Sequence, residues 1–205
     1  MDGLVLDSEP DYRLAWRKAA EDMGTQLDDA FFKSLSGCAY DSVESTLKNI
    51  CGDSFSFPHF RKLSAKIWRE NVTRYGINTK PGYRLLLDRL QLQRIPYCLA
   101  TNSPRQHAEE CLTLAGIRQD FDILVTLDQV EKGKPAPDIY LQASTTIKCP
   151  PEKCLAVEDS APGIQSALAA GAIPIMISDD PILYEDHKEL SIPILGSLSK
   201  LANLI

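Results

Sequence analysis

Short apolar runs alternate with helical stretches from Pro81 to the end of the sequence. Each run is too short for most helices and nearly all apolar; the runs lie at residues 95–100, 121–125, 154–157 and 173–177. The helical stretches between them lie at about 104–115, 138–147 and 162–170. Continuous apolar strands that alternate with helices form a parallel sheet covered on both faces. The pattern therefore predicts an α/β fold with a doubly wound parallel sheet.

The block before this alternation, residues 11–77, contains helical patterns and no convincing strand. Ser8 can cap a helix that has Pro10 in its first turn, and Gly24 supplies a stop. Apolar residues recur at helical spacing in this block. Helices are expected in three places, at about 11–23, 41–50 and 60–75.

Composition changes at residues 7–10 and again at residues 78–82. Such changes mark the places where a chain passes between domains. We therefore expect a helical cap over residues 11–78, inserted into an α/β core made of residues 1–10 and 79–205.

Charge and hydropathy exclude several classes of partner. The formal net charge is −6 and the isoelectric point is near 5.1, whereas nucleic-acid binding rests on clustered Lys and Arg. No apolar run approaches the roughly 20 residues that span a bilayer, and the first residues lack a secretory signal. We expect a cytoplasmic monomer that binds neither nucleic acid nor membrane, although a small anionic ligand can still bind locally.

The six cysteines include no C-x-x-C pair, and Cys98 and Cys154 lie inside apolar runs. This usage is typical of reduced thiols and not of a metal cluster. We therefore expect reduced, mostly buried cysteines.

Polar residues of a selected kind follow three of the apolar runs. They are Thr101 and Asn102, then Lys134, then Glu158 and Asp159. Ligands of open parallel sheets bind outside the carboxyl ends of the strands. Taken singly, these residues are equally typical of helix caps or of a solvated loop lysine. Together they predict a site that holds a phosphoryl group through Thr101, Asn102 and Lys134, and a divalent cation through Asp159 and Glu158.

With these residues in place, the sequence resembles the haloacid dehalogenase-like hydrolase superfamily, in the helical-cap branch of β-phosphoglucomutase-like and phosphoglycolate-phosphatase-like enzymes. The resemblance covers essentially the whole chain and rests on four motifs. They are Met1-Asp2-Gly3-Leu4-Val5-Leu6-Asp7-Ser8-Glu9-Pro10, Leu99-Ala100-Thr101-Asn102-Ser103, Gly133-Lys134-Pro135-Ala136-Pro137-Asp138 and Val157-Glu158-Asp159-Ser160-Ala161-Pro162-Gly163.

The resemblance implies a role for each matching residue. Asp2 would be the general acid and base, and its backbone carbonyl a Mg²⁺ ligand. Thr101 would hydrogen-bond the transferring phosphoryl group, and Lys134 would balance the charge of the nucleophile and the phosphate. Asp159 would bind the cation directly, and Glu158 would support it. These roles suit phosphoryl transfer, which mainly needs positioning and neutralised charge.

One departure from the family concerns the nucleophile. The family pattern is Asp-x-Asp-Gly, and Met1 stands at the x, so the attacking aspartate would precede residue 1. The first core strand, which carries that aspartate in the family, is absent from the sequence. Loss of a central strand leaves two rows of unpaired backbone groups. We therefore expect the chain as given to show little or no turnover through an aspartyl-phosphate.

Within the resembling branch, hydrolysis of a small phosphorylated metabolite such as a sugar phosphate is the preferred interpretation. Mutases of the branch use a His and an Arg in the cap, and Tyr12 and Tyr40 stand in those stretches here. A mutase is therefore a lesser alternative. The other alternative is a non-catalytic relative that binds a phosphorylated ligand or a protein partner.

Overall fold

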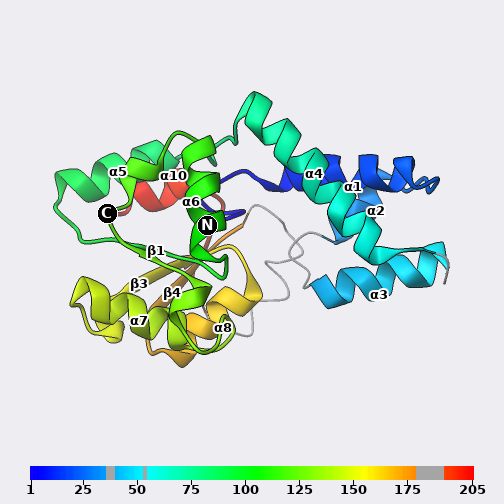
Figure 1. The fold of residues 1–205 in the computed structure, drawn as a ribbon. Coiled ribbons are helices and arrows are strands. Elements are labelled where there is room, and N and C mark those ends of the chain that lie inside the picture. The colour runs from blue at the N-terminus through cyan, green and yellow to red at the C-terminus, as the bar shows by residue number, and fades with distance from the viewer. Residues whose placement is uncertain (36–39, 53–54, 179–191) are drawn as a thin grey trace. The chain divides into compact units, whose positions relative to one another are not determined.

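A computed structural model describes residues 1–35, 40–52, 55–178 and 192–205. The chain divides into two compact units, each described by itself. The first consists of Met1–Leu6 and Asn78–Ile205 and is called the α/β unit; the second is Asp7–Ile77 and is called the helical unit. Figure 1 shows the elements of both units.

The helical unit contains helices α1 to α4 in the part of it that the structure describes. They span Glu9–Asp22, Asp29–Ser34, Tyr40–Cys51 and Phe57–Tyr75. The three expected helices are confirmed as α1, α3 and α4, whereas the short α2 was not expected. Ser8 is the N-cap residue of α1, but its side chain makes no capping hydrogen bond. Helices α1 and α4 pack together, and the ring of Tyr12 stacks on that of Trp68 at 5.3 Å.

The α/β unit contains the alternating elements that the apolar runs predict. Its helices are α5, α6, α7, α8 and α10, at Tyr83–Leu92, Arg105–Leu114, Asp138–Ile147, Ala161–Ala169 and Leu198–Ala202. Its strands are β1 to β5, at Leu99–Ala100, Leu124–Val125, Leu155–Glu158, Ile173–Ile177 and Ile194–Leu195. All expected strands are confirmed, although β1 and β2 are shorter than expected. The last strand and the last helix were not expected.

All described strand pairs in the α/β unit are parallel, which confirms the fold class. They form two separate sheets, one of β1 and β2 and one in the order β3, β4, β5. In Figure 1 helices α5 and α10 lie together on one side of the strands, and α7 and α8 lie on the other. The doubly wound arrangement is therefore present, but β1 and β3 are not paired with each other.

The first residues of the chain are fixed within the α/β unit. Leu6 is fully buried and forms an antiparallel bridge with Thr79, and the N–H of Lys80 donates to the carbonyl of Val5 at 2.9 Å. Asp2 forms a backbone bridge with Leu6. The segment that carries Asp2 is therefore tied to the segment that returns from the helical unit.

The expectation of mostly buried cysteines is wrong for four of the five described ones. Only Cys111 is buried, whereas the others are half-buried: Cys51, Cys98, Cys149 and Cys154. All five are free thiols. Cys38 lies outside the described residues. Within the described ranges, every helix falls short of the length and hydropathy that a membrane span requires.

Candidate active site

A buried ion pair joins two of the candidate residues. Lys134 Nζ donates to Glu158 Oε1, and the two side chains are only 9% and 5% exposed. Lys134 Nζ also donates to the carbonyl of Ala100 at 3.1 Å, at the end of β1. Glu158 is the last residue of β3. The pair therefore links the carboxyl ends of two strands that belong to different sheets.

Tyr140 is a third member of this buried group, and no sequence motif indicated it. Its hydroxyl donates to the same Glu158 oxygen, and its ring lies 5.1 Å from Lys134 Nζ. Burial and the charge of Glu158 raise the pKa of Tyr140, so the hydroxyl keeps its proton. Tyr140 is the third residue of α7, directly after the loop of residues 130–137 that carries Lys134, called the lysine loop. This position next to the lysine loop is the only sequence feature that could have indicated a role for Tyr140.

Asn102 holds the backbone of the lysine loop. Its amide nitrogen donates to the carbonyl of Lys134 at 3.1 Å, and its amide oxygen accepts from the Lys134 N–H at 2.7 Å. A Cβ at Gly133 would lie 2.7 Å from that oxygen and 2.6 Å from Leu127 Cδ1, so a larger residue there would displace one of these side chains. The other end of the loop is held where Ser166 Oγ donates to the carbonyl of Ala136 at 2.6 Å. Thr101, also buried, accepts from the N–H of Ser103 at 3.1 Å.

Asp159 lies against the first residues of the chain. Burial raises the pKa of its carboxyl to about 6, while the nearby ammonium group of Met1 lowers it. Glu158 raises the pKa of Asp159 and Lys134 lowers it, so the four charges lie within electrostatic reach. Gly3 has φ of 71°, and a Cβ there would overlap Asp159 Oδ2. Asp2 lies between Met1 and Gly3, the two residues that approach the Asp159 carboxylate.

The six candidate residues thus gather at one edge of the α/β unit. Asn102, Lys134 and Glu158 are linked by hydrogen bonds, Thr101 adjoins the carbonyl that Lys134 contacts, and the chain around Asp2 adjoins Asp159; the residues are Asp2, Thr101, Asn102, Lys134, Glu158 and Asp159. The arrangement supplies one fixed cation, three carboxylates, and the hydroxyl of Thr101. Such a cluster suits binding and transfer of an anionic group that is accompanied by a cation.

The chain belongs to the haloacid dehalogenase-like hydrolases, since the model of that family matches residues 1–171. A phosphorylated carbohydrates phosphatase of Thermotoga maritima is 32% identical over 171 residues, which cover 83% of this chain and 79% of that relative. The beta-phosphoglucomutase of Bacillus subtilis is 28% identical over 200 residues, 91% of this chain and 84% of the relative.

Solved structures agree with the family match. A crystal structure of a HAD hydrolase of family IA, variant 3, from Entamoeba histolytica matches with a TM-score of 0.78 at 26% identity, covering 98% of this chain and 92% of that one. The resemblance read from the four motifs is therefore confirmed, and the phosphatases among the relatives support a phosphatase function.

We expect Lys134→Met to destabilise the protein by about 3 to 5 kcal/mol, because it leaves the Glu158 carboxylate buried without its partner. Urea denaturation measures the difference in the free energy of unfolding. Lys132→Met is the matched control, since Lys132 is an exposed lysine of the same loop. Equal stability of the two variants would contradict the buried pair.

We expect Tyr140→Phe to destabilise the protein by about 2 kcal/mol, because a hydrogen bond to a charged, buried group is lost while the ring stays. Tyr75→Phe, on a ring that is 70% exposed, should change stability by no more than about 0.5 kcal/mol. Denaturant titration of both variants makes the comparison. A Tyr140→Phe protein as stable as its control would exclude the contact with Glu158.

Proposed function

We propose that this protein is a Mg²⁺-dependent phosphatase of small phosphorylated metabolites, sugar phosphates in particular, acting through an aspartyl-phosphate. The proposed nucleophile is an aspartate joined directly to the nitrogen of Met1. The observation that carries this proposal is the position of that nitrogen. A Cβ at Gly3, two residues further on, would overlap Asp159 Oδ2, so a residue joined to that nitrogen would lie near the candidate cluster.

The proposed chemistry has two steps. An oxygen of the nucleophilic aspartate bonds to phosphorus while the bond from phosphorus to the leaving oxygen breaks, and Asp2 gives that oxygen its proton. Asp2 then takes a proton from water, whose oxygen attacks the phosphorus and releases inorganic phosphate and the free aspartate. Asp2 serves once as acid and once as base, as general acid–base catalysis requires.

The remaining residues stabilise charge and hold geometry. Lys134, fixed by its hydrogen bonds to Glu158 and to the Ala100 carbonyl, neutralises the phosphoryl oxygens, and Tyr140 holds Glu158 in place. Thr101 offers a hydroxyl to the same group. Asn102, whose amide is bonded to the Lys134 backbone at both ends, acts by positioning that lysine.

The donor chemistry fits Mg²⁺. This ion is commonly held by one or two carboxylates, with waters and substrate phosphate oxygens as its other ligands. Asp159 offers a carboxylate whose pKa is raised by desolvation, while the positive charge of Lys134 lowers it and favours the ionised form that binds a cation. No group of three or more His, Cys, Asp or Glu side chains suited to a metal occurs among the described residues. We propose Asp159 and the Asp2 carbonyl as ligands, with Glu158 as support; the ion would supply charge neutralisation at the phosphoryl group.

We propose that the helical unit is a cap that selects the leaving group and that the enzyme is a cytoplasmic monomer. The stacking of Tyr12 on Trp68 favours hydrolysis over a mutase, because it occupies Tyr12 in packing within the helical unit. The side chain of Tyr40 lies outside the described residues.

We expect a chain extended before Met1 by an apolar strand ending in Asp to hydrolyse sugar phosphates in Mg²⁺, and the 205-residue chain to show almost none. Phosphate release across a panel of phosphorylated sugars measures this. The same extension ending in Asn is the control, and we expect its rate to fall at least about 1,000-fold, as for loss of a covalent nucleophile. Equal rates for the Asp and Asn forms would overturn the covalent mechanism.

We expect Asp159→Asn to weaken Mg²⁺ binding by about tenfold or more, because it removes a charged ligand. Isothermal titration of the extended protein with MgCl₂ measures the affinity without turnover. Asp122→Asn, which changes an exposed acid of the same unit, should leave it unchanged. Equal weakening by both variants would mean that binding reflects overall charge and not a site.

A further inference from the structure

The loop between α7 and β3 carries two cysteines. Cys149 lies just beyond the end of α7, and Cys154 directly precedes β3. Cys154 Sγ donates to the carbonyls of Cys149 and Pro150, at 3.4 Å in both cases. Because a carbonyl oxygen is about 2.4 Å from the α-carbon of its own residue, the Cys154 sulfur lies within about 6 Å of the Cys149 α-carbon. The turn of the loop therefore brings the two cysteines side by side.

The thiols of these two cysteines also interact with each other. Burial and a hydrogen bond with the Cys149 side chain both raise the pKa of the Cys154 thiol. Two sulfurs joined by a hydrogen bond have only the proton between them. They already lie near the range from which a disulfide forms.

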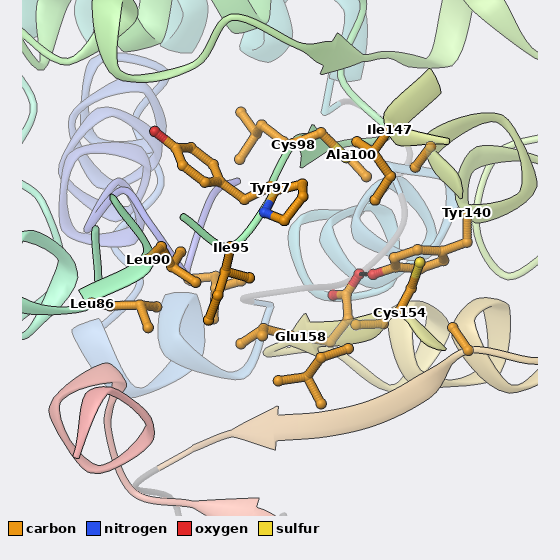
Figure 2. A pocket seen from close by; sticks show the side chains of 18 of the residues that line it. Leu86, Leu90, Ile95, Tyr97, Cys98, Ala100, Tyr140, Ile147, Cys154 and Glu158 are labelled. Carbon is orange, nitrogen blue, oxygen red and sulfur yellow. Dashed lines mark hydrogen bonds between the residues drawn. The ribbon is translucent and has the colours of Figure 1, made fainter. Parts of the chain in front are cut away.

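Cys98 is the other thiol close to Cys154. Both line a mostly apolar cavity of about 460 Å³ in the α/β unit, which Figure 2 shows. The charge of Cys98 acts on Cys154, whereas Cys149 shares a hydrogen bond with it as well. Cys51 belongs to the helical unit, and Cys111 is buried. Among the described cysteines, Cys149 is therefore the nearest thiol partner of Cys154.

Oxidation is a reaction that two neighbouring thiols can undergo together. A structural zinc site takes four ligands, and this pair supplies two. Both thiols are half-buried, and two exposed residues of the same loop, Glu152 and Lys153, lie between them in the sequence. A small oxidant can therefore reach the pair from solvent.

We propose that Cys149 and Cys154 form a redox-active dithiol that closes to a reversible disulfide on reaction with a low-molecular-weight disulfide such as oxidised glutathione. The new bond joins the end of α7, the helix that carries Tyr140, to the start of β3, the strand that ends at Glu158. The oxidation does not depend on the proposed phosphatase chemistry, because neither thiol takes part in it.

The exchange proceeds in two steps. The Cys154 proton is held by two carbonyls, so the Cys149 thiolate attacks first. A bond forms between Cys149 and one glutathione sulfur, the disulfide of oxidised glutathione breaks, and the first glutathione leaves and takes up a proton. The Cys154 thiolate then attacks the Cys149 sulfur and releases the second glutathione, which is protonated in turn. Two protein thiols lose two electrons and two protons, and one glutathione disulfide becomes two thiols.

The test incubates the native 205-residue chain with oxidised glutathione at mildly alkaline pH, blocks the remaining thiols with N-ethylmaleimide and maps the peptides by mass spectrometry. Trypsin cleaves after Lys148, Lys153 and Lys188, so it separates the two cysteines. We expect residues 149–153 to be linked to residues 154–188, and dithiothreitol to release them. This cross-link should exceed that of any other cysteine pair by about tenfold or more, because proximity favours ring closure.

Two serine variants check the order of the steps. Cys154→Ser removes the second thiol, so we expect glutathione to stay on Cys149 as a mixed disulfide. Cys51→Ser removes a half-buried thiol of the helical unit and should leave the cross-link unchanged. The parent chain should carry about tenfold less mixed disulfide on Cys149 than the Cys154→Ser chain.

Three results would refute the dithiol. A cross-link from Cys98 to either cysteine of the loop, in place of the expected one, would mean that the pair is wrong. Equal amounts of mixed disulfide on Cys149 in the parent and in Cys154→Ser would mean that Cys154 does not react with it. Unreacted Cys149 and Cys154, in a sample in which Cys51 has reacted, would mean that the oxidant does not reach the loop.

Discussion

Burial of the Lys134 and Glu158 charges is the constraint on which the rest of the candidate site depends. Two charges taken out of water are stable only where geometry is good and the remaining hydrogen-bonding groups are satisfied. Tyr140 and the Ala100 carbonyl meet that need at the side chains. Asn102 meets it at the backbone of the lysine loop. The ends of β1 and β3 and the start of α7 are thereby held together at one point.

Glycines next to the buried ion pair are as important to the geometry of the site as its charged side chains. A Cβ at Gly163 would overlap the carboxyl group of Glu158, as one at Gly3 would overlap that of Asp159. Glu158 and Asp159 can lie against the backbone at Gly163 and Gly3 only because glycine has no side chain. The Asp-Gly and Pro-Gly pairs in the motifs are therefore steric requirements of the charge cluster, in addition to any demand for unusual dihedral angles.

The sequence predicted the alternating elements well because each short apolar run is followed by a helical stretch, a pattern typical of a parallel sheet covered by helices. It could not predict β5, whose two residues, Ile194 and Leu195, carry no periodicity and pair only because β4 is already placed. Likewise the run from Ile95 to Ala100 pairs with β2 only from Leu99 onward, and Pro96 has no N–H to offer a ladder. Tyr140 escaped prediction because a tyrosine in the first turn of a helix has no pattern until its neighbours are known.

The bridge between Leu6 and Thr79 has a consequence for how such a chain is assembled. The chain leaves the α/β unit after Leu6 and re-enters it near Thr79, and these two residues form a backbone bridge. Residues 7–77 are therefore an insertion that begins and ends at the same place in the α/β unit. The entropic cost of closing a loop grows only slowly with its length, so insertions of very different length can be closed by the same bridge. Asp7–Ile77 can therefore be exchanged for another module, or shortened to a turn, without rethreading the strands that carry the charged cluster.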